Sequence, residues 1–173
     1  KSFAEASEKK TDEILDLLSD EDEIDLEQEL LSSDPSKEES SQHTQREKPR
    51  FEDKQQKMLV AGGHYYMQKK YEKAVSVFKR IVRKYPQNIE AFYNLGNSYF
   101  RLNEWEEARN AYEEACRLDP TFLDAIENLG VIHANQKNFK KAVDVWKRLL
   151  EYDPKRTDIK KKIEKALKLS KGI

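Results

Sequence analysis

The side chains with the most versatile chemistry in this sequence are one cysteine, Cys116, and three histidines, His43, His64 and His133. None of the histidines stands near cysteine or carboxylate side chains at the spacing that holds a metal ion. Nothing close to Cys116 in the sequence would lower the pKa of its thiol, so we expect an inert, packed cysteine. Each glycine lies inside a helical pattern rather than in a phosphate-binding loop. The sequence therefore predicts a protein that is not an enzyme, with no metal site and no cofactor.

Charge is distributed unevenly along the chain. Residues 1–50 contain 16 acidic and 7 basic side chains, a net charge of −9, whereas residues 51–173 carry a net charge of +8. No apolar run approaches the roughly 18 residues of a membrane-spanning helix, and a single cysteine allows no intramolecular disulfide. We expect a soluble protein of the cytoplasm, or of the bacterial periplasm or envelope, in which an acidic N-terminal part is joined to a basic body.

A repeat with a 34-residue period accounts for most of the basic body. Asn-Leu-Gly occurs at 94–96 and again at 128–130. Within each copy, apolar residues recur at three- and four-residue steps, so each copy contains two helices, about 89–102 and 105–118 in the second. We therefore expect three repeats, 55–88, 89–122 and 123–156. Their glycine, alanine and proline landmarks are Gly62, Gly96 and Gly130, then Ala74, Ala108 and Ala142, then Pro86, Pro120 and Pro154.

This pattern resembles the tetratricopeptide repeat (TPR), a helix–turn–helix unit of solenoid proteins. The first repeat departs from the family pattern at Ala61 and Ile81, and the third departs at His133 and Leu149. The resemblance covers about 102 of the 173 residues and implies an all-α fold, a right-handed solenoid of three helix pairs that bury their faces by stacking. The second repeat matches best, at Leu95, Gly96, Tyr99, Ala108, Tyr112, Ala115 and Pro120.

A further helix is expected over residues 157–173, where it would cap and solvate the end of the solenoid. Its apolar stripe consists of Ile159, Ile163, Ala166, Leu167 and Leu169. Nucleic acid is not expected as a partner, because this segment has no aromatic side chain on which a base could stack. The lysines that form its predicted basic face are Lys160, Lys161, Lys162, Lys165 and Lys168.

The resemblance also implies a concave groove, lined by the first helix of each repeat, that binds a peptide. Amide side chains can hydrogen-bond an extended peptide and aromatic side chains supply apolar contact. An equal alternative is that Asn94 and Asn128 only satisfy neighbouring helix groups. TPR domains that clamp a C-terminal carboxylate need lysines at both ends of the clamp, and these are absent here. The predicted groove residues are Tyr66, Tyr93, Asn94, Asn97, Phe100, Arg101, Glu127, Asn128, Val131 and Asn135.

The acidic N-terminal part divides into a segment, residues 1–31, and a flexible linker, residues 32–50, that has no hydrophobic side chain. The segment cannot form a core alone, and we expect it to be largely disordered or to dock on a partner. The apolar residues predicted to dock are Ile14, Leu15, Leu17, Leu18, Ile24, Leu26, Leu30 and Leu31.

These features together favour a non-enzymatic scaffold or adaptor whose partner is another protein or a peptide, including an acidic one. The N-terminal segment would be a second binding element, or an arm that docks on the same chain or on a second copy. The alternatives are a chaperone of the type III secretion or assembly type, and a regulatory subunit of an enzyme.

Overall fold

The structure, a computed structural model, describes residues 51–171, with side chains from residue 54 onward. The predicted acidic segment 1–31 and linker 32–50 lie outside the described residues, as do residues 172–173. The chain divides after Ala61 into two units, residues 1–61 and 62–173, and helix α3 (Phe51–Met67) runs across this division. The second unit, described below by itself, contains the end of α3 and all of the helices that follow.

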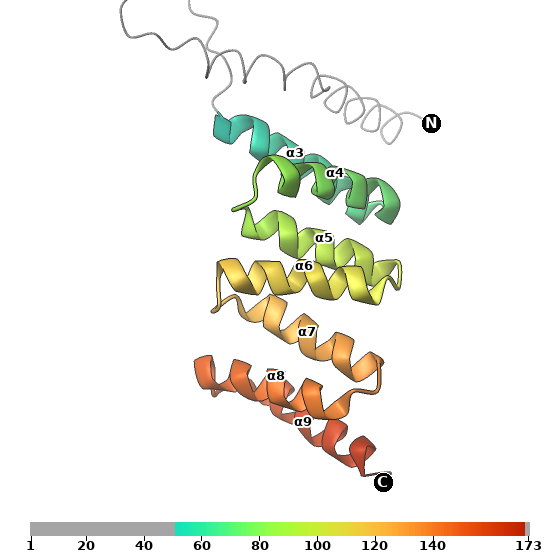
Figure 1. Ribbon diagram of the computed structural model, residues 1–173, viewed down its shortest axis with the longest axis vertical. Helices are drawn as coiled ribbons and strands as arrows, with labels where there is room; N and C mark the ends of the chain where they lie inside the picture. The colour runs from blue at the N-terminus through green and yellow to red at the C-terminus, as the bar shows by residue number, and fades with distance from the viewer. Residues whose placement is uncertain (1–50, 172–173) are drawn as a thin grey trace, which may run out of the picture. The chain divides into compact units, whose positions relative to one another are not determined.

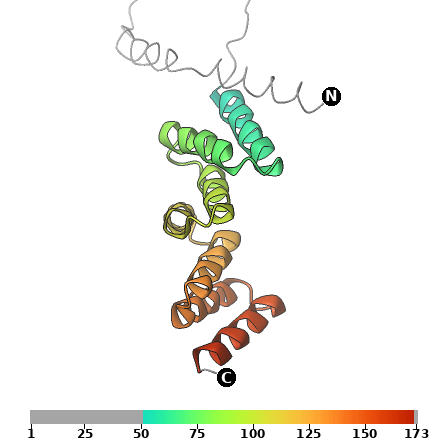
Figure 2. The ribbon, with the colours of Figure 1, turned by 90° about the vertical axis from the view of Figure 1, so that its right-hand side faces the viewer.

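Six further helices succeed one another with short connections. In the second unit each helix from α4 onward contacts the next one in the sequence, as Figures 1 and 2 show from green to red. The described residues form helices and no strand, and the helices predicted at 89–102 and 105–118 are confirmed to within one residue. The helices are α4 (Tyr71–Lys84), α5 (Ile89–Arg101), α6 (Trp105–Leu118), α7 (Leu123–Asn135), α8 (Phe139–Tyr152) and α9 (Thr157–Ser170).

The repeated glycines are required by a close approach between the two helices of each pair. A Cβ atom on Gly96 would lie 2.6 Å from a ring carbon of Tyr112, and one on Gly130 would lie 2.1 Å from Nε1 of Trp146. Gly62 meets the ring of Phe78 in the same way. Because such contacts are far below van der Waals distance, the spacing of glycine and aromatic residues sets how closely each pair packs.

The turns inside the helix pairs also repeat from one pair to the next. The second residue of each turn adopts a left-handed conformation, with φ close to +61°. In the turn between α5 and α6, the backbone N–H of Glu104 then donates to the carbonyl of Tyr99 (3.0 Å). This arrangement satisfies carbonyl groups that a helix end leaves unpaired. The left-handed residues are Lys69, Asn103 and Lys137.

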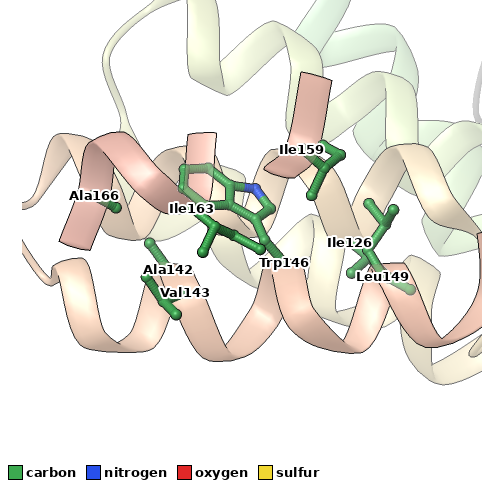
Figure 3. Packing of buried hydrophobic residues seen from close by; sticks show 8 residues of the cluster. All are labelled: Ile126, Ala142, Val143, Trp146, Leu149, Ile159, Ile163 and Ala166. Atoms are coloured by element: carbon green, nitrogen blue, oxygen red, sulfur yellow. The ribbon is translucent and has the colours of Figure 1, made fainter. Parts of the chain in front are cut away.

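Helix α9 continues the repeat in register as an additional first helix. Ile159 is fully buried, as is Ala125 at the equivalent position one repeat earlier, and Ile163 is as little exposed as Leu129. Glu164 replaces the repeated glycine and is exposed, since no described helix follows that would bring an aromatic ring against it. The core that α9 closes (Figure 3) consists of Ile126, Ala142, Val143, Trp146, Leu149, Ile159, Ile163 and Ala166.

The predicted apolar stripe of α9 is wrong at its end. Leu167 and Leu169 are 42% and 49% exposed, whereas Ile159, Ile163 and Ala166 are buried. Leu167 stands at the repeat position of Tyr99, which is buried in a repeat that has a second helix. Among the described residues no second helix follows α9, so Leu167 stays open to solvent. Leu169 has another reason for its exposure, because it stands at the repeat position of Arg101 and Asn135, which are exposed in repeats that do have a second helix.

Candidate protein-binding surface

The predicted groove residues occupy repeat-related positions on the first helices of the pairs. We call these the inner positions: Asn94, Asn128 and Lys162 form one row with a single residue from each successive repeat, and Asn97, Val131 and Lys165 form a second. Arg101, Asn135 and Leu169 form a third row. The structure places all ten predicted groove residues outside the core: Arg101 and Asn135 are exposed and the other eight are half-buried.

Tyr66 and Arg101 come together through a residue that the groove prediction missed, Tyr71 at the start of α4. The rings of Tyr66 and Tyr71 meet edge to face with centroids 5.4 Å apart. Nε of Arg101 donates to the hydroxyl of Tyr71 (3.1 Å), and the guanidinium lies 5.3 Å from the centroid of that ring. Burial raises the pKa of Tyr66, partly offset by the positive charge of Arg101, so Tyr66 stays a neutral donor at physiological pH.

Amide and aromatic side chains join α5, α6 and α7. Oδ1 of Asn97 accepts hydrogen bonds from the hydroxyl of Tyr112 (2.7 Å) and from Nδ2 of Asn128 (3.2 Å). Tyr93 packs edge to face on Phe122, with ring centroids 5.1 Å apart. Asn97 and Asn128 therefore bond to each other across two repeats, which agrees with the alternative that amides here satisfy neighbouring helices. We call Asn97, Tyr112 and Asn128 the amide cluster.

Two other predicted groove residues of α5, Phe100 and Asn94, differ in whether their side chains contact other residues. Phe100 packs edge to face on Trp105, with ring centroids 5.1 Å apart. Asn94 receives a hydrogen bond from Ser98 at its backbone carbonyl (2.8 Å), and its side-chain amide has no hydrogen-bond partner among residues 54–171. The amide of Asn94 is thus a half-buried donor and acceptor that a ligand can use.

Glu127 is surrounded by positive charge. Its carboxylate accepts from Nη2 of Arg156 (2.5 Å) and from Nζ of Lys162, and Arg156 also binds Asp158 (2.8 Å). Burial alone would raise the pKa of Glu127, but the hydrogen bonds from Lys162 and Arg156 outweigh it and lower this pKa below its usual value. We call Glu127, Arg156, Asp158 and Lys162 the charged cluster, and it occupies the Glu127 carboxylate that the groove prediction had offered to a ligand.

A cavity of about 260 Å³ lies where α7, α8 and α9 meet. Its lining combines two groups of residues that were predicted as separate surfaces. Val131 and Asn135 belong to the predicted groove, and Lys162 and Lys165 belong to the predicted basic face. Lys160, Lys161 and Lys168 do not line the cavity. The complete lining is Val131, Ala134, Asn135, Phe139, Trp146, Lys162, Lys165, Ala166 and Leu169.

Sequence reasoning missed Ala134, Phe139, Trp146, Ala166 and Leu169 as lining residues. A signal was present: extending the repeat by one more period places Lys162, Lys165 and Leu169 at inner positions. The indole orientation had no such signal, since it depends on Nε1 of Trp146 donating to the carbonyl of Glu127 (3.1 Å).

Among the described residues, His64, His133 and Cys116 show little reactive character. His64 exchanges a hydrogen bond with Gln68 (2.8 Å). Burial, with the charges of Lys141 and Arg109, lowers the pKa of His133, and its Nδ1 has no partner within the described chain. Burial raises the pKa of Cys116 to about 11, so the reactive thiolate is scarce at neutral pH. Residues 51–171 bring together no metal-binding group of His, Cys, Asp and Glu.

The class of protein follows from this architecture: it is an α-helical repeat protein whose first helices carry a row of half-buried and exposed polar and aromatic side chains. Family models match in the same region. The model described as TPR repeat matches residues 96–137, and the one described as Tetratricopeptide repeat matches residues 124–156. The model described as Anaphase-promoting complex, cyclosome, subunit 3 matches residues 51–115. The chain is a tetratricopeptide repeat protein, and its described residues form three helix pairs and a C-terminal capping helix.

Solved structures, TPR domains among them, resemble it in fold. The first TPR of Spaghetti (RPAP3), bound to the HSP90 peptide SRMEEVD, superposes with a TM-score of 0.63 at 21% identity, over 66% of this chain and 91% of that one. A crystal structure of MamA gives 0.65 at 23% identity, over 70% and 71%. The complex of the TPR2B domain of yeast Sti1 with pHsp70 gives 0.62 at 16%, over 66% and 97%.

No curated protein matches the chain significantly. Within the described residues, no helix combines the length and the apolar character needed to cross a membrane.

Proposed function

We propose that this protein is an adaptor that holds a segment of a partner protein along the inner positions of α5, α7 and α9. The carrying observation is that aromatic and amide side chains stand at or next to these positions without entering the core: Tyr93, Asn94, Asn97 and Phe100 are all half-buried. Each of these side chains keeps part of its surface open to solvent, and this open part is available for recognition. The TPR structures named above that contain HSP90 or Hsp70 partners support this use of the surface.

The chemistry of the inner positions suits an extended peptide. The amide of Asn94 offers both a donor and an acceptor to a peptide backbone. Arg101 is exposed beyond its contact with Tyr71 and offers a planar cation to a carboxylate. The partner segment therefore combines backbone hydrogen bonding with at least one acidic group. The lysines of a C-terminal carboxylate clamp are absent, so we expect an internal segment rather than a free C-terminus.

The acidic segment 1–31 supplies a second binding element in this proposal. Its eight apolar residues named above stand among dense acids, and the charges of −9 and +8 on the two parts of the chain attract each other. The segment acts either on a separate protein surface or as an arm that docks on a TPR body. Docking on a second copy would make the protein self-associate. Salt screens the attraction between the two parts, so sedimentation experiments at rising ionic strength should then show the assembly dissociating.

A pair of identical substitutions tests the binding surface. Asn94→Arg places a bulky cation at an inner position, and Asn110→Arg places the same side chain on the exposed face of α6. The full-length chain and both variants are used to purify partners from the source cells. We expect a stoichiometric partner with the wild type and Asn110→Arg, and at least a tenfold loss with Asn94→Arg. Equal recovery with both variants would show that the partner binds elsewhere.

A further inference from the structure

We infer that the cavity between α7, α8 and α9 receives a leucine- or phenylalanine-sized side chain of an acidic partner segment, whose neighbouring carboxylate binds Lys165. This inference rests on the proposed function, because it defines the chemistry of the partner at the C-terminal end of the same inner positions.

The cavity has the size and lining of a site for one side chain. Its volume of about 260 Å³ exceeds the roughly 150 Å³ that admits benzene in an engineered apolar cavity. It falls below the roughly 300–1,000 Å³ of sites for drug-sized ligands. Trp146 and Ala166 are buried at its inner end, whereas Asn135 and Lys165 are exposed at its mouth. The cavity is therefore open to solvent on one side and apolar within.

Its walls are held in place. The indole of Trp146 is packed against Gly130 and bonded through Nε1 to the carbonyl of Glu127 (3.1 Å). Buried Ile159 and Ile163 fix α9 against the same core, as Figure 3 shows. An apolar group that enters thus meets a preformed surface, and little conformational entropy is lost on binding.

The charges around the cavity favour an acidic partner. The only ionisable residues in its lining are Lys162 and Lys165. The charged cluster contains two cations and two anions, so the charge of Lys162 is balanced by Glu127. Lys165 is exposed and has no ion pair within residues 54–171, and it leaves one unbalanced positive charge at the mouth. An apolar group attached to a carboxylate-bearing segment satisfies both features.

A nucleic acid would use the lysines of α9 but gain nothing from the apolar interior, and α9 has no aromatic residue for stacking. A free fatty acid would combine an acyl chain with a carboxylate, but a cavity of this volume buries only part of such a chain. We therefore assign the site to a protein segment and retain the fatty acid as an outcome of the test.

The test uses the full-length chain with Trp105→Phe, which leaves Trp146 as the fluorescent reporter inside the cavity. The probes are three acidic peptides of about twelve residues, a length that spans about 40 Å when extended, identical except for a central Leu, Phe or Ser. We expect saturable changes in Trp146 emission, with the Leu or Phe peptide binding at least tenfold more tightly than the Ser peptide. Equal affinities for all three, or no binding, would overturn the inference.

Two cavity variants and one matched control locate the contact. Ala134→Leu fills the cavity, and Lys165→Glu reverses the charge at its mouth. Lys161→Glu makes the same charge change on an exposed part of α9 outside the lining. We expect about tenfold weaker binding of the Leu peptide for each cavity variant and less than threefold for Lys161→Glu. Unchanged binding by Ala134→Leu with an unaltered melting temperature, or equal losses for the two lysine variants, would contradict the assignment.

The remaining outcomes separate this inference from the adaptor function. Asn94→Arg could abolish peptide binding while Ala134→Leu and Lys165→Glu retain it. That result would support the adaptor surface and show that the cavity is not part of it. Dodecanoate that binds in the cavity as tightly as the Leu peptide would overturn the partner class. The adaptor function is tested separately, by whether Asn94→Arg loses the partner purified from cells. The cavity proposal can therefore fail while the adaptor function holds, and the reverse is also possible.

Discussion

The inner positions of this protein form two regions that share a backbone but differ in chemistry. Between α5 and α7, Asn97 joins Tyr112 to Asn128 through neutral hydrogen bonds. Between α7 and α9, Glu127 joins Arg156 to Lys162 through ion pairs beside an apolar cavity. Packing positions therefore set the scaffold, whereas inner positions one repeat apart carry quite different side-chain chemistry.

The packing contacts beneath the two regions are of the same kind. In each, a glycine of the first helix lies against an aromatic ring of the second: Gly96 on Tyr112, and Gly130 on Trp146. The hydroxyl of Tyr112 extends to the amide cluster, while the indole of Trp146 forms a wall of the cavity. The ring at this repeat position therefore links the core to the inner surface in both regions.

Substitution of the repeated glycines should give the largest effects on stability. In Gly130→Ala the new Cβ would lie 2.1 Å from Nε1 of Trp146, so the indole must move and lose its bond to Glu127. We expect a loss of about 3 kcal/mol in the free energy of unfolding, from overpacking and the broken bond. Gly96→Ala, with a ring-carbon contact of 2.6 Å, should lose about 1–2 kcal/mol. Urea unfolding measures both.

Gly63→Ala is the matched control, because nothing lies within 4 Å of a Cβ at this helical position. It should raise stability by about 0.5–1 kcal/mol, since alanine favours a helix over glycine. If Gly130→Ala were as stable as this control, the close approach of α7 and α8 would not exist.

The charged cluster should be the more sensitive region to acid. Glu127→Gln removes the anion between Arg156 and Lys162 and should lower the free energy of unfolding by about 1–2 kcal/mol at neutral pH. This value is smaller than that of a buried ion pair because all three side chains are partly exposed. The folded-state pKa of Glu127 is lowered, so its contribution is complete above the unfolded pKa of about 4.3. That contribution disappears as the pH falls through the lower folded-state value.

The pH dependence can be measured by urea unfolding of the wild type and Glu127→Gln between neutral and acidic pH. The stability gap between wild type and Glu127→Gln should narrow as acid protonates Glu127. A gap that stays constant down to low pH would mean that the carboxylate is not paired in the folded protein.

The amide cluster should respond less strongly and without dependence on salt. Tyr112→Phe deletes the donor of the 2.7 Å bond to Asn97, with the ring still packed on Gly96. We expect a loss of about 1 kcal/mol, the usual value of a neutral hydrogen bond. The loss should be the same in low and high salt, whereas that of Glu127→Gln should shrink as salt screens the ion pairs. Equal salt dependence would remove the distinction between the regions.

The turns should give the smallest effect, with opposite sign. Lys137 adopts φ = 61° in the turn that leads from α7 to α8, a conformation that costs a residue with a Cβ atom and that glycine adopts freely. Lys137→Gly should therefore stabilise the protein by about 0.5–1 kcal/mol. Asn103→Gly should gain less, because asparagine tolerates this conformation better than lysine. A lower melting temperature for Lys137→Gly would contradict the left-handed geometry.

The period of the repeat was sufficient to predict the helix pairs and the glycine contacts, because these features depend on residues at fixed local spacing. The exposure of Leu167 was not predictable from the apolar stripe, since it depends on the absence of a helix beyond α9 within the described chain. The exposure of Leu169 follows from the repeat, because Arg101 and Asn135 at the same repeat position are exposed too. The ion pairs of Glu127 join residues 29 and 35 positions apart. Such contacts depend on side-chain directions that sequence spacing does not specify.

Recognition at the inner positions can be tested by NMR mapping of the acidic Leu peptide on the isotopically labelled full-length chain. We predict the largest shifts at Val131, Asn135 and the indole N–H of Trp146, with smaller shifts at Asn94 and Asn97. Shifts concentrated at Asn110 and on the exposed faces of α6 and α8 would contradict recognition at the inner positions.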